Sequence, residues 1–217
     1  MKINKKIEVQ NLNELFDITC SNRTEYSSCW LNVSINNYNT AFVLFKNNIY
    51  CHAIFFMQQS IECLIKAILI ENNLISFSDI KSANHRPEQA LDEYLIDKKS
   101  ETYNTFLFIK DKIYHESNFE KKFQLALNII NDCTKQTNVI ITKDDSNTQL
   151  HIHYLINLHI YTLSILLGQL EQKTRYPNDN NETPNVLFDG SQIIKEIVPL
   201  LLECLENCIR RVCEIKT

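Results

Sequence analysis

Residues 51–70, CHAIFFMQQSIECLIKAILI, carry apolar side chains on every side of the helix they would form, and they contain no glycine or proline. A helix that is apolar all round is buried in a protein core. The few polar residues within it are then informative, because burying a polar group requires a partner. We therefore expect a helix over about residues 49–72 whose polar residues either stabilise the core or form a site.

Glycine is scarce in this chain: only Gly168 and Gly190 occur in 217 residues, together with four prolines. The phosphate cradles GxGxxG and GxxxxGK need several residues without a Cβ atom, so dinucleotide-fold dehydrogenases and P-loop NTPases are excluded. An all-β chain would need frequent turn residues, so the same scarcity favours long helices. The composition predicts one all-helical domain of ordinary size.

Helical spacing of the apolar residues divides most of the chain into successive helices. Pro199 lies inside the last of them, and because proline has no N–H to donate, we expect a kink or a break near Ile197. Segment 139–148 combines a β-branched run with capping residues and is expected to be a connector. Residues 1–26 are interpreted as an appended N-terminal segment and residues 27–217 as the bundle. We expect helices over about residues 27–46, 49–72, 101–115, 118–135, 148–173 and 191–214, with a further one beginning at Pro87.

The charge balance and the cysteine pattern limit the partners and the compartment of the protein. The formal net charge is −4 and the pI is about 5.9, so there is no global basic field to attract a nucleic-acid backbone. The eight cysteines follow an N-terminus, MKINKKIEVQ, that lacks the apolar stretch of a signal peptide. We therefore expect a cytoplasmic protein with reduced, mostly buried thiols. No CxxC pair occurs, and Cys204 and Cys213 point to opposite sides of a helix, so we expect no metal site and no cofactor.

Residues 150–170, LHIHYLINLHIYTLSILLGQL, are the most hydrophobic stretch and are long enough to cross a membrane. Insertion would be costly, because the stretch contains His151, His153 and His159 and has little flanking positive charge. We expect a buried central helix of a soluble bundle and no membrane contact. The three histidines do not converge on one side of this helix, which argues against a metal triad, and we interpret His153 as a hydrogen-bonded core residue.

Two groups of polar residues are candidates for binding. Arg175 ends the long helix, where its guanidinium suits either a phosphate or the helix dipole. Glu62 and Lys66 have the favourable i, i+4 order of a structural ion pair, and if buried they are a candidate site. No serine, cysteine or threonine has a base nearby in the sequence, and no pair of carboxylates stands out, so we expect no catalytic residue. The residues that share the helix face of Glu62, within about 100°, are Gln58, Gln59 and Lys66.

The order of these elements resembles the HEPN domain family, the helical nucleotide-binding domain of prokaryotes and higher eukaryotes. The resemblance covers about residues 28–216. His85 matches the histidine with which the family begins the helix that follows, although Arg86 and Pro87 replace the usual residues after it. The family pattern Q-x-x-E-x-x-x-K-A is matched by Gln59, Glu62, Lys66 and Ala67, and its R-Y-P turn by Arg175, Tyr176 and Pro177.

The resemblance implies an up-and-down bundle of about five main helices with extra short helices, commonly a symmetric dimer, with a groove for a nucleotide or RNA. Many relatives are ribonucleases of toxin–antitoxin and antiphage systems, which act through an R-x4-6-H motif without a metal. No arginine here is followed by a histidine at that distance, and without an imidazole to move a proton the ribonuclease mechanism lacks its general acid and base. The residues four to seven positions after Arg175 are Asp179, Asn180, Asn181 and Glu182.

The sequence thus favours a non-catalytic module that recognises a nucleotide or RNA through Lys66 and Arg175. Glu62 would orient Lys66, and Tyr176 would stack on a base. We expect Lys66 and Arg175 to open onto one groove, within about 15 Å of each other. The complete set of expected nucleotide-binding residues is Gln59, Glu62, Lys66, His85, Arg175 and Tyr176.

Two alternative functions remain open. The first is a divergent, metal-independent ribonuclease toxin that uses His153 or His85 in place of the missing histidine. The second is an interaction scaffold whose polar residues only fix helix register. We also expect a homodimer formed through the long or the closing helix, since residues 150–170 offer more apolar surface than one bundle face buries. A nucleotidyltransferase or an antitoxin is the expected partner protein, within a toxin–antitoxin or antiphage defence system.

Overall fold

The computed structural model describes residues 24–76, 78–82, 91–92, 101–140, 146–175, 189 and 191–214. These residues form six α-helices and one 3-10 helix, and no strand occurs among them, so the all-α prediction is confirmed. The predicted N-terminal segment 1–26 and the predicted helix beginning at Pro87 lie mostly outside the described residues. The elements are α2 (Glu25–Lys46), α3 (Tyr50–Glu71), η2 (Asp79–Ser82), α5 (Glu101–His115), α6 (Phe119–Ile140), α7 (Ser146–Arg175) and α9 (Gln192–Glu214).

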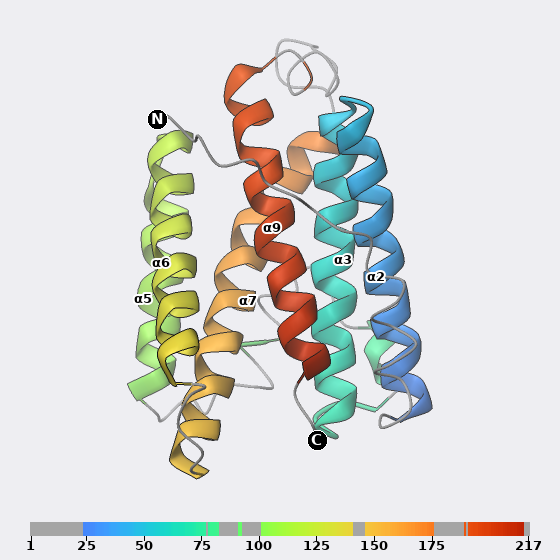
Figure 1. Ribbon diagram of the computed structural model, residues 1–217, viewed down its shortest axis with the longest axis vertical. Helices are drawn as coiled ribbons and strands as arrows, with labels where there is room; N and C mark the ends of the chain where they lie inside the picture. The colour runs from blue at the N-terminus through green and yellow to red at the C-terminus, as the bar shows by residue number, and fades with distance from the viewer. Residues whose placement is uncertain are drawn as a thin grey trace.

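The helices alternate in direction, and α3 is enclosed by three of the others. Figure 1 shows α2 and α7 running one way along the long axis, and α3 and α9 running the other way. α3 contacts α2, α7 and α9, while α5 and α6 pack on the far side of α7. The up-and-down bundle implied by the resemblance is therefore present, and its most enclosed apolar helix is the one formed by residues 50–71.

Asparagines and a threonine set the ends of α2 and α3. The side chain of Thr24 accepts a hydrogen bond from the backbone N–H of Ser27 at 3.3 Å and caps the start of α2. Asn48 and Asn73, which follow α2 and α3, have positive φ angles of 61° and 54°. Asparagine tolerates this left-handed conformation better than most non-glycine residues, so it ends helices in a chain that has almost no glycine.

Two buried serines fix how α2 packs against α3. Ser34 Oγ donates to the backbone oxygen of Ser60, and Ser60 Oγ donates to the backbone oxygen of Ser34, each at 2.8 Å. Both side chains are completely buried. The reciprocal bonds satisfy both hydroxyls inside the core, and small side chains at this point let the two helices approach closely. The antiparallel register of the two helices follows from this contact.

The most apolar helices are buried inside the bundle. Among the described residues, only Tyr50–Glu71 is long and apolar enough to cross a membrane, and 83% of its apolar window is buried, as in the core helix of a bundle. On α7, nearly all side chains from Leu155 to Leu170 are buried as well. Residues 155–170 therefore offer little of the spare apolar surface from which we predicted a dimer, and the dimer itself stays a prediction.

The structure corrects two predictions about where helices are interrupted. α9 continues from Gln192 to Glu214 with Pro199 inside it, so of the expected kink or break near Ile197, the break does not occur. Val198 and Leu201 are fully buried beside the proline, and this packing offsets the lost backbone hydrogen bond. α6 extends to Ile140, so the β-branched residues at 139–140 end a helix and do not begin the connector. Their helix propensity is only slightly reduced, so an adjoining helix can include them.

The described cysteines are free, and most are buried thiols, as predicted. Cys51, Cys133 and Cys208 are buried, whereas Cys29 is exposed. Burial raises the pKa of Cys63 and of Cys204 to about 12, so both thiols stay protonated and unreactive at neutral pH. No group of three metal-ligating side chains is found in the part of the chain that the structure describes.

Candidate functional site

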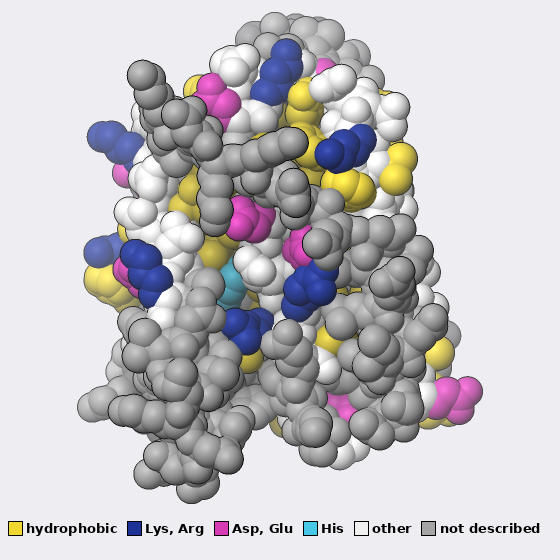
Figure 2. Space-filling model, in the orientation of Figure 1, with side chains coloured by type: hydrophobic (Ala, Val, Ile, Leu, Met, Phe, Trp, Pro, Cys, Tyr) yellow, Lys and Arg dark blue, Asp and Glu magenta, His cyan; other side chains and the backbone are white. Residues whose placement is uncertain are grey.

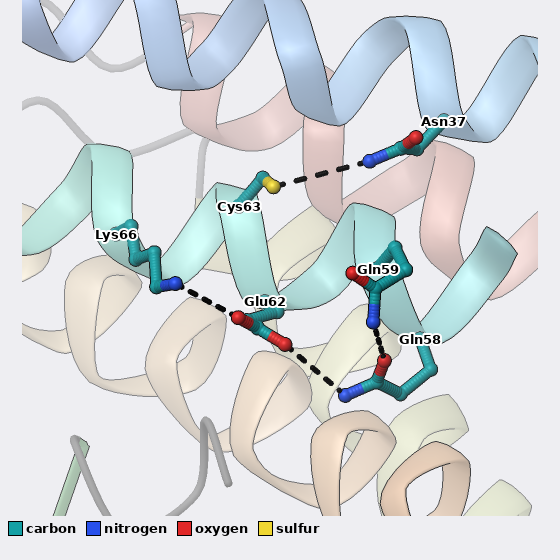
Figure 3. Close-up of polar contacts among 6 residues, drawn as sticks. All are labelled: Asn37, Gln58, Gln59, Glu62, Cys63 and Lys66. Atoms are coloured by element: carbon teal, nitrogen blue, oxygen red, sulfur yellow. Dashed lines mark hydrogen bonds and ion pairs between the residues drawn. The ribbon is translucent and has the colours of Figure 1, made fainter. Parts of the chain in front are cut away.

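The polar residues predicted to share a face of α3 form a connected row (Figure 3). Lys66 Nζ lies 2.8 Å from Glu62 Oε1, and Gln58 Nε2 donates to Glu62 Oε2 at 3.4 Å. Gln59 Nε2 donates in turn to Gln58 Oε1. Gln58, Glu62 and Lys66 have exposed fractions of only 1%, 4% and 9%. We call these four residues the polar row; it contains a buried ion pair, in contrast to the exposed pair that the sequence also allowed.

The polar row lies on the side of α3 that is turned toward α7. Figure 3 shows the side chains of Gln58 and Glu62 pointing away from α2, whereas Cys63, on another side of α3, accepts a 3.9 Å hydrogen bond from Asn37 of α2. The i, i+4 spacing of Gln58, Glu62 and Lys66 stacks them one above another on the helix. Because α3 is enclosed by its neighbours, this face is buried although its residues are polar.

Burial makes the polar row sensitive to the loss of either charge. Taking a carboxylate and an ammonium out of water costs several kcal/mol per ion, and a close ion pair with further hydrogen bonds offsets that cost. Glu62 meets this requirement, because Lys66 and Gln58 donate to its two oxygens. Removing Lys66 alone would take away the ammonium that lies 2.8 Å from this buried carboxylate, so losing one charge should cost more than losing both.

Lys66 also lies against Trp30, the only tryptophan of the chain. Its Nζ atom is 4.9 Å from the centroid of the Trp30 ring, within the range of a cation–π interaction. The indole N–H of Trp30 is buried and has no hydrogen-bond acceptor. An ammonium group has three donors, and the acceptor that Lys66 uses is Glu62. The Lys66–Trp30 end of the row therefore has more donors than acceptors, which suits the oxygens of a phosphate or a carbonyl group.

Of the remaining predicted site residues, only the backbone of Arg175 lies in the described part of the chain. Arg175 is the last residue of α7, and because α3 and α7 run in opposite directions it lies near the end of the bundle where α3 begins (Figure 1). Lys66 is 16 positions beyond Tyr50, the first residue of α3, which corresponds to about 24 Å along the helix axis. The backbone thus does not support one groove shared by Lys66 and Arg175. The side chain of Arg175, and His85 and Tyr176, lie outside the described residues.

A buried histidine on α7 is a residue that the sequence did not single out. His159 has an exposed fraction of 7%, and its Nε2 atom is buried without a hydrogen-bond partner. Burial, together with the positive charge of Arg211 on α9, lowers the pKa of His159 to about 4. The imidazole is therefore neutral at physiological pH. The position of His159 on an apolar helix was the sequence feature that could have pointed to it. The spacing of residues along α7 could not predict that Arg211 of α9 lies beside it. His153, which we interpreted as a core histidine, has a side chain outside the described residues.

A second polar network joins α2 to α9. Tyr38 is fully buried, and its hydroxyl donates to Glu206 Oε2 at 3.0 Å. Arg210 binds the other oxygen of Glu206, with Nη2 at 2.8 Å and Nε at 2.9 Å. Burial, reinforced by Glu206, raises the pKa of Tyr38. The i, i+4 spacing of Glu206 and Arg210 is that of a pair on one helix, but no local pattern connects this pair to a tyrosine 168 positions away.

The surface does not concentrate positive charge on the face that Figure 2 displays. There, Lys and Arg side chains alternate with Asp and Glu side chains over the described part of the molecule. This mixture agrees with the net charge of −4. Any contact with a nucleic acid on this face would depend on individual side chains, because this face carries no broad positive charge that would attract the phosphate backbone.

The fold and the polar row define the class of this protein: an all-α, up-and-down bundle whose most enclosed helix carries a buried glutamate–lysine pair. A model of the HEPN domain family matches residues 27–145, which is more than half of the chain. The chain therefore belongs to the HEPN domain family, and the resemblance inferred from its motifs is confirmed. Comparisons with curated proteins and with solved structures found no match. Glu62 and Lys66 lie within the matched residues, and Arg175 lies beyond them.

Proposed function

We propose that this HEPN domain is a non-catalytic module that binds a nucleotide or RNA, and that the Lys66–Trp30 end of the polar row contacts the ligand. The observation that supports this site is the surplus of donors there: Lys66 has one carboxylate acceptor, and the indole N–H of Trp30 has none. Phosphate oxygens accept charge-assisted hydrogen bonds from lysine, and a base offers carbonyl oxygens and a ring face. Glu62 holds the ammonium of Lys66 in position.

The separation of Lys66 from Arg175 bears on the size of the ligand. The two residues lie toward opposite ends of the bundle, so a single mononucleotide would not reach both. A strand of several nucleotides would, with Lys66 contacting one phosphate and Arg175 another. Tyr176 would then stack on a base near Arg175. We therefore favour an RNA strand as the ligand, with Gln59 and His85 completing the binding set.

The fluorescence of Trp30 tests this proposal directly, because no other tryptophan contributes to the emission. Titration with AMP, ATP or a short single-stranded RNA should change the emission in a saturable way. The variant Glu62→Gln/Lys66→Met removes both charges of the row and should weaken binding by about 1–3 kcal/mol, or roughly fivefold to 150-fold. The matched control Glu206→Gln/Arg210→Met removes a pair of the same spacing on α9 and should bind as the wild type does. Unchanged affinity in the first variant would refute the site, and no saturable change with any ligand would refute the function.

Catalysis is the alternative that the same protein preparation tests. Incubation with labelled RNA and a chelator should give no cleavage product, because the sequence lacks the R-x4-6-H spacing that supplies the proton relay. His159 is a poor substitute, since its lowered pKa of about 4 is far from that of an efficient proton carrier at neutral pH. Cleavage that is lost in His153→Ala or in His85→Ala would instead establish a ribonuclease.

The cellular role that fits a binding module is part of the same proposal. The protein would act in the cytoplasm, beside a nucleotidyltransferase or an antitoxin, in a toxin–antitoxin or antiphage defence system. Purification of the tagged protein from its host, followed by identification of the proteins that remain bound at high salt, tests for such a partner. Recovery of a partner without any nucleotide or RNA, from a protein that also fails the titration, would favour the scaffold alternative.

A further inference from the structure

The hydrogen bonds that connect the polar row run toward Glu62 (Figure 3). A carboxylate can only accept hydrogen bonds, and Glu62 accepts one from Lys66 and one from Gln58. Gln58 must therefore turn its amide nitrogen toward Glu62 and its oxygen away, and that oxygen accepts a hydrogen bond from Gln59. The charge of Glu62 thus fixes the polarity of the whole row, and the Lys66 end presents donors.

Two donors from two helices lie close together at the Lys66–Trp30 end of the row. Lys66 Nζ, on α3, is 4.9 Å from the centroid of the Trp30 ring, on α2. Within the described part of the chain, Lys66 uses Glu62 as its acceptor, and the indole N–H of Trp30 has no acceptor. Neither an ammonium group nor an indole N–H can accept a hydrogen bond. The ligand atoms that bind here must therefore be acceptors.

The four bases of RNA differ in what they present to such a pair of donors. Guanine carries two neighbouring acceptors, O6 and N7, on one edge. At the corresponding positions adenine carries N7 beside an amino group, cytosine carries an amino group, and uracil carries a single carbonyl oxygen. An amino group against an ammonium or an indole N–H would oppose two donors and leave buried polar groups without partners. Guanine is the base that satisfies both donors with one edge.

We propose that the Lys66–Trp30 end of the polar row selects guanine, with Lys66 and Trp30 donating to O6 and N7. The proposal rests on the proposed function and adds base selectivity to it. Lysine that binds O6 and N7 of guanine is a common base-specific contact of proteins. Glu62 holds the ammonium in place before a ligand arrives, which lowers the entropic cost of binding. The favoured ligand is RNA with an unpaired guanine, whose edge is open to side chains.

A series of nucleotides tests the base selectivity on the wild-type chain by isothermal titration calorimetry. GMP should bind about tenfold more tightly than AMP, because a pair of contacts to the correct base is worth about fivefold to 150-fold in affinity. IMP keeps O6 and N7 but lacks the 2-amino group, so it should bind as tightly as GMP. 7-Deaza-GMP lacks only N7, so its affinity should lie between those of GMP and AMP. Equal affinities for GMP and AMP, or binding of IMP as weak as that of AMP, would refute guanine selection.

The same titrations distinguish failure of the selectivity from failure of the proposed function. If GMP and AMP bind with equal affinity, a nucleotide site exists and only guanine selection is refuted. If neither these nucleotides nor a short single-stranded RNA binds, the proposed function is refuted as well.

The variant Trp30→Phe tests whether this site is the origin of the selectivity. It keeps an aromatic ring beside Lys66 but removes the N–H donor, so it should weaken the binding of GMP more than that of AMP. The preference for GMP should fall by about twofold to tenfold, the range for one lost hydrogen bond. The matched control Tyr50→Phe removes a ring donor at the start of α3 and should leave the preference unchanged. A preference that also persists in Trp30→Phe would show that guanine is recognised elsewhere and would overturn the proposal.

Discussion

Two glutamates, each four residues before a cation, form pairs that differ in their surroundings. In α3, Glu62 lies 2.8 Å from Lys66, and in α9 Glu206 lies 2.8 Å from Arg210. The side chains of the first pair are 5% and 11% exposed, and those of the second are 12% and 32% exposed. The spacing and the contact distance are the same, so the packing around each pair must account for any difference in its role.

The second oxygen of each glutamate shows what this difference means. Glu206 uses it to accept a hydrogen bond from Tyr38, a residue of α2, so the pair in α9 connects two helices. Glu62 uses it to accept a hydrogen bond from Gln58 of its own helix, and the indole N–H next to Lys66 has no acceptor. The α9 pair therefore stabilises helix packing, whereas the α3 pair orients a cation beside an unused donor.

The largest expected effect is the loss of stability in Lys66→Met. This change removes the cation that lies 2.8 Å from the buried carboxylate of Glu62 and should lower the free energy of unfolding by about 3–5 kcal/mol. Arg210→Met leaves a more exposed carboxylate that keeps its bond from Tyr38, and it should cost only about 1 kcal/mol. Urea unfolding followed by circular dichroism measures both values.

The double variant Glu62→Gln/Lys66→Met separates the effect of the buried charge on stability from the effect of side-chain packing. Replacing both ions leaves a neutral amide and an apolar side chain of similar volume, so most of the lost stability should return. If Lys66→Met cost no more than Arg210→Met, Glu62 would be solvated in solution and the contrast between the two pairs would disappear.

Much of the fold is readable from the sequence, because helix spacing and capping are local properties. The predicted helix 101–115 coincides with α5, and the ends of α2 and α3 fall within two residues of the predicted ends. The predictions that failed depended on tertiary context. Pro199 is accommodated within α9 because Val198 and Leu201 are buried beside it. No local pattern contains that information.

The candidate site is readable only in part, for the same reason. The shared face of Gln58, Glu62 and Lys66 follows from the helical period, and the structure confirms that they are connected. The contact of Lys66 with Trp30 depends on how α2 packs against α3, and the position of Arg175 depends on the direction of α7. Neither follows from the period of one helix. A sequence pattern therefore predicts which residues of a helix act together, but not which helices bring their residues to one place.

An intermediate effect is expected from pH acting on His159, which is buried next to Arg211, the neighbour of Arg210. The pKa of His159 is about 4 in the folded protein and about 6.5 when unfolded, so between these values the unfolded state binds more protons. The contribution of this group to the free energy of unfolding is fully present above pH 6.5. It is lost as the pH falls toward 4, by about 3 kcal/mol in total. Urea unfolding at several pH values should show this loss in the wild type and in His52→Gln, a control at an exposed position. An equal loss in His159→Leu would show that other groups cause it.

The smallest effect is expected from Tyr38→Phe, which removes the hydrogen bond that connects the α9 pair to α2. The hydroxyl of Tyr38 is buried and donates to an ionised carboxylate, so its loss should lower the free energy of unfolding by about 1–2 kcal/mol. Tyr50→Phe is the matched control: its hydroxyl donates at 2.8 Å to the neutral amide oxygen of Asn48, an exposed residue two positions away, so its loss should cost about 0.5 kcal/mol or less. Combining Tyr38→Phe with Arg210→Met should cost less than the sum of the single changes, since both act on Glu206. Additive costs would show that Tyr38 and Arg210 act independently, and α9 would then lack the cooperative network that separates its pair from the pair in α3.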